Sequence, residues 1–392
     1  MDGQAPRLSS LFLDRLSLVL VGILLFVALL NHHHELIVLS LLVLGTAGGA
    51  KLWAGVSRSR LACRFAVDRS RLFPGEPLAL TLEAGNQSCL PMALQITTPV
   101  SGLLGPSGEP ALSGEVGFLW YQRVELQWTL TASRRGVHRL GPHRCTTGDL
   151  FGFFTSTWMA GEALEIVVYP RIVPIARFPL PRRDFFGIPG AESPVRDPVY
   201  ILGTRDYQPG RPAKHIHWKA TARHHRLQEK LFEPTEQAKI LLAVDVEGFA
   251  RYGAGQEFER TLEVMASLAV RLDREGCAVG LIANGVVEGG RGAVVPIGRH
   301  PQHLPSILEL LARLGMKPAA PLLDAVRAGN HLPWGISCLC FSVENAGGMI
   351  SVLDYFARRH VPVILFVSRP GSGDTQADVR PLHGILLEER AG

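Results

Sequence analysis

The chain has 392 residues, enough for two or three domains at ~150 residues each, and hydrophobic residues make up 47% of it against 19% charged residues. These values exclude a disordered chain, which combines low hydrophobicity with high net charge, and the positive mean hydropathy of +0.16 indicates that part of the chain lies in lipid. The formal net charge of +5 is spread along the chain rather than focused, so we expect no nucleic-acid partner. The six cysteines are too few for a disulfide framework and include no CxxC pair, which argues against a structural zinc site.

Two apolar runs, at 16–30 and 36–50, come first along the chain, and the polar residues 31–35 separate them. Each run spans ~22 Å as a helix at ~1.5 Å per residue, and flanking apolar residues can extend both toward the ~30 Å of a bilayer core. A secretory signal peptide is the main alternative, but it predicts a single apolar run followed by a cleavage site. We therefore expect residues 1–60 to form a transmembrane helical hairpin.

Cations flank the open ends of this hairpin and predict its orientation, because cationic flanks stay on the cytoplasmic side. They are Arg7, Arg15, Lys51, Arg58, Arg60 and Arg64. Both termini should therefore be cytoplasmic, in a multi-pass protein of the cytoplasmic (inner) membrane.

Residues 61–170 show a different pattern, in which apolar and polar residues alternate over short runs such as 124–133 and 164–170. Turn signals at Arg135-Gly136 and Gly141-Pro142 separate these runs. Short alternating strands with Gly/Pro turns are typical of a β-sandwich. This segment holds no apparent catalytic motif, so we expect a spacer or a docking surface.

A basic block at 203–236 contains seven Lys and Arg residues between Arg205 and Lys230, with only Asp206 and Glu229 as acids in that span. A helix is expected at 214–224, followed by a strand at 227–234. Two interpretations stay open. Oriented cations can clamp a phosphate or carboxylate or bind a partner. Alternatively, the charges pair with one another and Trp218 packs in the core. The charges that would pair are Arg205, Asp206, Arg223 and Glu229.

The block resembles the bacterial domain of unknown function 58 family, whose hallmark is similar to RxYxxGDxxRxIHWKxxAR. The residues that fall on this pattern are Arg205, Tyr207, Gly210, Ile216, His217, Trp218, Lys219, Ala222 and Arg223. Arg211 departs from it where the family has Asp, and Lys214 or His215 stands where the family has Arg. Residues 134–142, 148–154 and 167–170 and the paired apolar runs also resemble this family.

The resemblance implies partners rather than chemistry. Members of the family resemble components found with MoxR-type AAA+ ATPases and transglutaminase-like membrane proteins, and no reaction characterises the family. The hypothetical partner- or anion-binding residues are Arg205, Asp206, Tyr207, His217, Trp218, Lys219 and Arg223.

Residues 238–370 alternate between buried-strand and helix patterns, which predicts a doubly wound α/β sheet. Strands are expected at 238–246, 277–285, 335–343 and 361–368, and helices at 256–276, 301–315 and 347–360. Residues 171–237 connect this domain to the β-sandwich, and residues 371–392 form a tail without a clear element.

The order of these elements resembles a von Willebrand factor A-like domain. In that family the first strand ends in Asp-x-Ser-x-Ser, whose oxygens hold Mg²⁺. Here Asp245 is followed by Glu247 and Phe249, so both serines are missing. Asp245 and Glu247 are weak candidates for a hard cation such as Mg²⁺, and we otherwise expect no cofactor and no metal.

No nucleophile–base pair and no phosphate-binding loop stands out, so we expect no enzyme. The sequence thus favours a membrane-anchored cytoplasmic interaction or scaffold protein. The resemblance implies a MoxR-type ATPase as its partner, in the assembly or maturation of envelope complexes. The alternative is a metal- or phosphate-binding enzyme or sensor that uses Asp245, Glu247 and the basic block 205–230.

Overall fold

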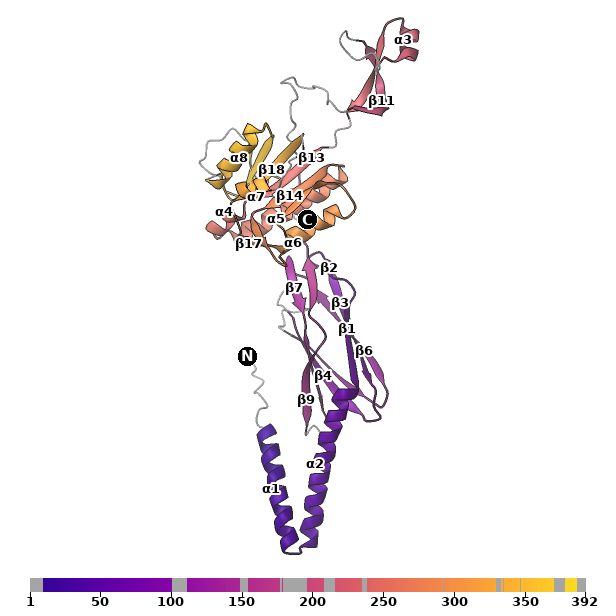
Figure 1. The fold of residues 1–392 in the computed structure, drawn as a ribbon, viewed down its shortest axis with the longest axis vertical. Helices are drawn as coiled ribbons and strands as arrows, with labels where there is room; N and C mark the ends of the chain where they lie inside the picture. Colours follow the sequence, from indigo (N-terminus) through magenta and orange to yellow (C-terminus); the bar gives the residue numbers. More distant parts are fainter. Residues whose placement is uncertain are drawn as a thin grey trace, which may run out of the picture. The chain divides into compact units, whose positions relative to one another are not determined.

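A computed structural model gives the fold of the chain (Figure 1). The structure describes residues 10–100, 111–148, 154–176, 178, 196–207, 216–234, 238–290, 292–328, 333, 335–345, 347–369 and 378–385. Several residues on which the predictions above depend lie outside the described residues: Arg7, residues 149–153, Gly210, Arg211, Lys214 and His215. The described residues divide into two compact units, Met1–Tyr169 and Pro170–Gly392.

The first unit begins with two consecutive helices, α1 (Ser10–Leu30) and α2 (His34–Arg60), that contact each other. Among the described residues, α2 is the one helix long and apolar enough to cross a membrane, and Ser17–Leu30 forms a shorter apolar helix. Ala28 and Ser40 are buried, whereas most of the large apolar side chains of both helices are exposed. An N-terminal apolar helix is therefore present. That both helices cross a membrane as a hairpin, with cytoplasmic termini, stays a prediction.

The last turns of α2 pack on the β-rich part of the same unit. Ala50, Ala54 and Ser57 follow one another at helical spacing and are all buried, and this helix contacts β8 (His143–Gly148) and β9 (Thr155–Ala160). Small residues on one helix face allow this close approach. The end of α2 is therefore part of the folded unit.

The rest of the first unit is a β-rich body of three sheets in the described residues, ordered β1-β3-β6, β2-β10-β7 and β5-β4-β8-β9. Its other strands are β1 (Leu61–Val67), β2 (Arg71–Leu72), β3 (Pro77–Asn86), β4 (Met92–Pro99), β5 (Ala111–Phe118), β6 (Arg123–Thr131), β7 (Gly136–Leu140) and β10 (Leu164–Val168). Along β3 every second residue from Leu78 to Asn86 is buried, as the alternation predicts. Leu80 of β3 belongs to the same core as Ile166 of β10, and Leu82 to the same core as Leu94 of β4, so the sheets share their apolar faces.

The second unit contains a two-stranded sheet of its own, formed by β11 (Arg196–Asp206) and β12 (Gln228–Pro234), with α3 (Trp218–His224) between them in the chain. We call residues 196–207 and 216–234 the signature segment. The expected strand at 227–234 is present. The helix expected at 214–224 begins only at Trp218, because Ile216 is extended and bridges to Glu229.

A six-stranded sheet in the order β16-β14-β13-β18-β19-β20 forms the centre of the second unit. All neighbouring strands run parallel except β16, which pairs antiparallel with β14. Its strands are β13 (Lys239–Val244), β14 (Ala278–Ala283), β16 (Val294–Gly298), β18 (Ile336–Ser342), β19 (Val363–Val367) and β20 (Asp378–Pro381). The central strands are buried along their whole length, in agreement with their continuous apolar runs.

The remaining elements of this unit are helices and a small two-stranded sheet. They are α4 (Val246–Arg251), α5 (Gly255–Arg274), α6 (His303–Arg313), α7 (Leu322–Ala328), α8 (Gly348–Arg358), β15 (Gly285–Val287), β17 (Leu314–Pro318) and the 3₁₀ helix Leu382–Ile385. The expectation of no element after residue 370 was wrong, because β20 extends the sheet beside β19. The likeness to a von Willebrand factor A domain stays a prediction.

Candidate functional site

Backbone hydrogen bonds hold the signature segment in one conformation. The amide of Tyr207 donates to the carbonyl of Leu227 at 2.8 Å, and the amide of His217 donates to the carbonyl of Gln228 at 2.7 Å. Gln228 in turn donates its amide to Thr221 Oγ1 at 3.0 Å, which ties α3 to the start of β12. The segment therefore presents α3 in a defined position on its own two strands.

Both ends of α3 are capped by histidines. His217 Nδ1 accepts a hydrogen bond from the amide of Ala220 at 3.1 Å, which satisfies a free donor of the first turn. His225 follows the helix with a left-handed backbone, at φ 51°, and such a residue ends a helix. His217 is therefore a structural residue of this segment.

Trp218 opens α3 and is 69% exposed. Lys219 and Arg223 are exposed on the same short helix. The interpretation that Trp218 packs in the core was therefore wrong. The reason is local, because the helix begins at Trp218 and none of its seven residues is buried.

The acids of the segment lie on its two strands. Asp206 is exposed and its carboxylate accepts a hydrogen bond from the side-chain amide of Gln228. Glu229 is buried and lies opposite Arg205 in the β11–β12 register. The structure thus brings Arg205 and Glu229 to one register position, while Arg223 stands apart on α3. Gln228 was not singled out from the sequence, since a lone glutamine gives no signal of its own.

The second predicted position, Asp245, lies at the carboxyl edge of the six-stranded sheet. The chain leaves β13 there, and β13 lies between β14 and β18, so the order of the sheet reverses at this strand. Ligands of open α/β sheets bind at such switch points. Two other polar residues end strands at this edge, Asn284 after β14 and Ser342 in β18.

These neighbours hold the Asp245 carboxylate. Asn284 Nδ2 donates to Oδ1 at 3.2 Å, and Ser342 Oγ donates to Oδ2 at 3.4 Å. The amide of Gly248 donates to it as well. A Cβ atom at Gly248 would lie 2.9 Å from Oδ2, so only glycine lets the first turn of α4 approach this closely.

Burial raises the pKa of Asp245 above its ordinary value, while the hydrogen bonds from Asn284, Gly248 and Ser342 lower it and the nearby Glu247 charge raises it. Glu247 itself is bound elsewhere, since its carboxylate accepts a hydrogen bond from Arg251 at 2.8 Å on the surface of α4. Within the described residues no three His, Cys, Asp or Glu side chains gather as metal ligands. Asn284 and Ser342 were missed from the sequence, although their place after buried strands was a usable signal.

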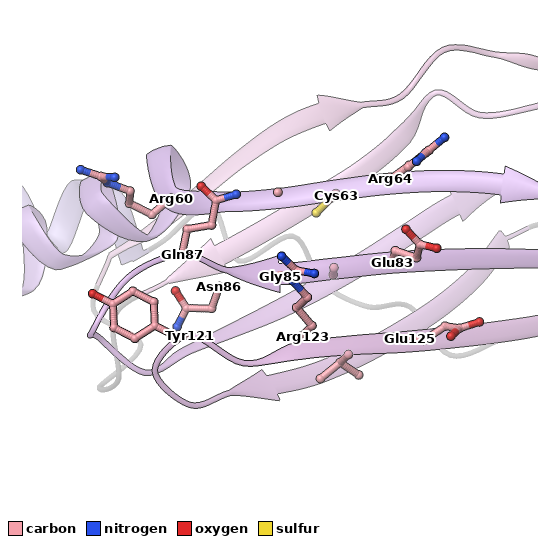
Figure 2. Close-up of a pocket in the computed structure, with 13 residues that line it drawn as sticks. Arg60, Cys63, Arg64, Glu83, Gly85, Asn86, Gln87, Tyr121, Arg123 and Glu125 are labelled. Carbon is pink, nitrogen blue, oxygen red and sulfur yellow. The ribbon is translucent and has the colours of Figure 1, made fainter.

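A third feature, which the sequence did not indicate, is a hollow of about 910 Å³ on the outer face of β1, β3 and β6. It forms because Gly85 and Ala62 lie side by side on this face and offer almost no side chain. Figure 2 shows Arg60 and Tyr121 at the end of the hollow next to α2, with Glu83 and Glu125 farther along the strands. Arg123 lies opposite Gly85, and its Cγ would be 3.3 Å from a Cβ there.

Comparisons with known proteins give a family match for part of the chain. Residues 203–333 match the model of the "Protein of unknown function DUF58" family. "Uncharacterized protein YeaD" of Bacillus subtilis (strain 168) is 24% identical over 261 residues, which are 65% of this chain and 63% of that protein. The chain therefore covers less than two thirds of the length of this relative.

Solved structures resemble the chain only weakly. The CARDB domain of the PF1109 protein from Pyrococcus furiosus, in complex with di-metal ions, is 10% identical with a TM-score of 0.20 and matches 28% of this chain and 91% of that one. The cupredoxin domain of amoB from Nitrosocaldus yellowstonii is 10% identical with a TM-score of 0.20 and matches 29% of this chain and 89% of that one. At these scores neither likeness indicates a shared fold. What the comparisons confirm is the resemblance of residues 203–333 to the domain of unknown function 58 family.

Proposed function

We propose that this protein is a membrane-anchored interaction protein whose signature segment docks a protein partner. The observation that carries the proposal is the exposure of Trp218, at 69%, on a helix that also presents Lys219 and Arg223. A large exposed aromatic ring on the same short helix as cations has the composition of protein–protein hot spots, in which Trp and Arg are enriched.

The rigidity of α3 supports the same proposal. Its caps and its bond to β12 fix the backbone from which the ring and the cations project before a partner arrives, and such preorganisation lowers the entropy lost on binding. The cations favour a partner with an acidic patch, because complementary charge raises the association rate. The resemblance to the domain of unknown function 58 family points to a MoxR-type AAA+ ATPase and a transglutaminase-like membrane protein as partners, in the assembly or maturation of envelope complexes.

Membrane anchoring belongs to the proposal. Supporting it are the apolar surface of α1 and α2 and the length of α2. Arg58 and Arg60 in the last turn of α2 support a cytoplasmic position for the body that follows. The protein would be a non-enzymatic component of the cytoplasmic membrane with both termini in the cytoplasm.

Replacing Trp218 by alanine should remove the partner from complexes cross-linked in membranes, because loss of a hot-spot side chain weakens binding by about 2 kcal/mol or more, roughly 30-fold. The measurement is the quantitative recovery of each co-purified protein with the wild-type chain and with the variant. Met159→Ala is the matched control, since Met159 is also exposed, at 55%, but lies in the other unit and has no part in the proposed site. Recovery that is the same for both variants and the wild type would contradict the proposal.

The contribution of positive charge to partner binding is tested with two charge-reversal variants. Lys219→Glu should reduce recovery of the same protein, whereas Lys317→Glu, an exposed lysine of β17, should not. Equal losses from the two charge reversals would indicate a nonspecific effect of net charge.

A second candidate function is a ligand site at Asp245, favoured by its place where the order of the parallel sheet reverses. If Mg²⁺, Mn²⁺ or a nucleotide binds there, a concentration of 100 Kd should stabilise the protein by about 2.7 kcal/mol. A thermal shift with each ligand, absent in Asp245→Asn, would establish the site. The three hydrogen bonds that the carboxylate already accepts favour a structural role, so we expect no shift at millimolar concentration.

A further inference from the structure

The turn between β5 and β6 exposes three large side chains in a row. Leu119 is 55% exposed, Trp120 62% and Tyr121 69%. Single exposed apolar residues are normal on protein surfaces, but three adjacent ones form a continuous apolar tip that indicates an interaction site. Trp and Tyr, in addition, are the residues enriched where a membrane meets water.

Hydrogen bonds fix this tip to the loop between β3 and β4. The side-chain amide of Asn86 donates to the carbonyls of both Leu90 and Leu119 at 2.8 Å. The amide of Tyr121 donates to the carbonyl of Ser88 at 3.1 Å. Because Asn86 is buried and bridges the two loops, the tip cannot move independently of the loop.

The same loop lies along the last turns of α2. The amide of Gln87 donates to the carbonyl of Arg60 at 2.8 Å, and the indole of Trp53 donates to the carbonyl of Pro91 at 2.9 Å. The loop therefore follows α2 from Arg60 back to Trp53, and the apolar tip is held beside this stretch of the helix.

The length of α2 places its stretch from Trp53 to Arg60 relative to the bilayer surface. From the start of α2 at His34, about 20 residues of helix at ~1.5 Å each cover the ~30 Å of a hydrocarbon core. If His34 lies at one surface of the bilayer, the other surface falls near Trp53. The loop and the apolar tip then lie at the level of the lipid headgroups on the side of the β-rich body.

Cations surround the tip on the side of the hollow. Arg60 ends α2, and Arg123 begins β6 two residues after Tyr121 (Figure 2). Among the described residues, neither arginine side chain makes an ion pair or hydrogen bond within the protein. Apolar aromatic side chains flanked by unpaired arginines match an anionic membrane surface, where the rings enter the interface and the guanidinium groups meet phosphate.

We propose that the β5–β6 turn, Leu119–Tyr121, inserts into the headgroup region of the bilayer and that Arg60 and Arg123 bind the phosphates of anionic lipids there. This inference rests on the membrane anchoring of the proposed function and adds a second contact with the membrane. The contact fixes the β-rich body on the lipid surface, so the body does not pivot freely on α2.

The test uses the full-length protein in lipid nanodiscs whose phospholipids carry bromine on the acyl chains near the headgroup, which quenches tryptophan fluorescence on contact. We expect brominated lipid to remove less tryptophan fluorescence from Trp120→Phe than from the wild type, because the Trp120 ring touches the lipid. Trp218→Phe, the matched control from the signature segment, should leave the quenched emission unchanged. Quenched emission in Trp120→Phe equal to that of the wild type would overturn the insertion of the turn.

A third variant separates this inference from membrane anchoring. If Trp53→Phe removes quenched emission and Trp120→Phe does not, α2 spans the membrane and only the insertion of the turn is wrong. If the brominated lipid quenches no emission in the wild type, the anchoring fails and the insertion fails with it.

Lipid charge is tested in the same nanodiscs, made either from phosphatidylcholine alone or with added phosphatidylglycerol. The anionic lipid should increase quenching of Trp120, and Arg123→Gln should remove that increase. Arg139→Gln, at an exposed arginine of β7 outside the hollow, is the matched control and should retain it. An increase that Arg123→Gln leaves intact would overturn the role of this arginine.

Discussion

Replacing Phe341 by alanine should destabilise the second unit by about 3–5 kcal/mol, the usual cost of removing a fully buried aromatic ring. Phe341 lies in the central strand β18 with no exposed surface, and its ring stacks on that of Phe366 with centroids 5.3 Å apart. The neighbouring strands are fixed by the sheet, so the surroundings cannot collapse to fill the space. A unit of this size should lose roughly 6–20 °C in its unfolding midpoint.

Thermal unfolding of the detergent-solubilised chain measures this effect, with Trp218→Ala as the control. The control removes a larger ring, but from an exposed position, where substitutions usually change stability by less than about 0.5 kcal/mol. Comparable shifts in the two variants would mean that Phe341 is not in the core or that Trp218 is not on the surface.

The second large effect is an acid-induced loss of stability in the β-rich body, caused by His143. The ring is fully buried and stacks on Phe65 with centroids 3.5 Å apart. Its Nδ1 shares a hydrogen bond of 2.9 Å with Thr98 Oγ1, and its Nε2 has no partner among the described residues. Burial lowers the pKa of His143 from 6.5 to about 4, because a second N–H on the ring would have no acceptor.

The direction of this pH effect follows from the protonation of His143 in the folded chain and in the unfolded chain. Above pH 6.5 His143 is neutral in both the folded and the unfolded chain, and its burial costs no stability through protonation. As the pH falls from 6.5 to about 4, the unfolded chain binds a proton and the folded chain does not, so stability declines. Below about pH 4 both states are protonated and the loss stops, at about 3 kcal/mol.

Chemical denaturation at about pH 7 and about pH 4.5 should therefore show a larger loss for the wild type than for His143→Gln, by about 2 kcal/mol, since pH 4.5 lies above the end of the transition. Glutamine keeps a hydrogen-bonding group near Thr98 but does not titrate, so carboxylate effects common to both proteins cancel. Parallel losses in the two proteins would show that His143 does not control the acid response.

Local patterns in the sequence predicted most of the helices and strands, because the periodicity of a helix or strand depends only on residues close together in the chain. The helix expected at 256–276 is α5, Gly255–Arg274, and the strand expected at 335–343 is β18, Ile336–Ser342. The strand β20 was missed, since Asp378 to Pro381 has neither alternation nor an apolar run. It is a strand only because the edge of β19 offers it backbone partners.

The candidate site likewise was predicted in part from local sequence and was decided in part by tertiary contacts. The sequence identified the signature segment by its residue types, and the family match at 203–333 agrees. It could not tell whether Trp218 is buried or exposed, because a single tryptophan in a short helix has no periodic neighbours that define a buried face. Likewise, the partners of Asp245 lie 39 and 97 residues away in the chain, and only the parallel pairing of three strands brings them together.

The sequence by itself determined that an apolar N-terminal segment precedes a β-rich and then an α/β region, because composition and periodicity are local properties of a chain. The tertiary structure decided which side chains of those regions remain accessible, among them Trp218, Trp120 and Tyr121, and which are enclosed, such as His143. Exposure is set by contacts between segments far apart in the sequence. The sequence could name Trp218, Lys219 and Arg223 as candidates for partner binding, but the accessibility of Trp218 and the surface that we propose for lipid could be recognised only in the folded chain.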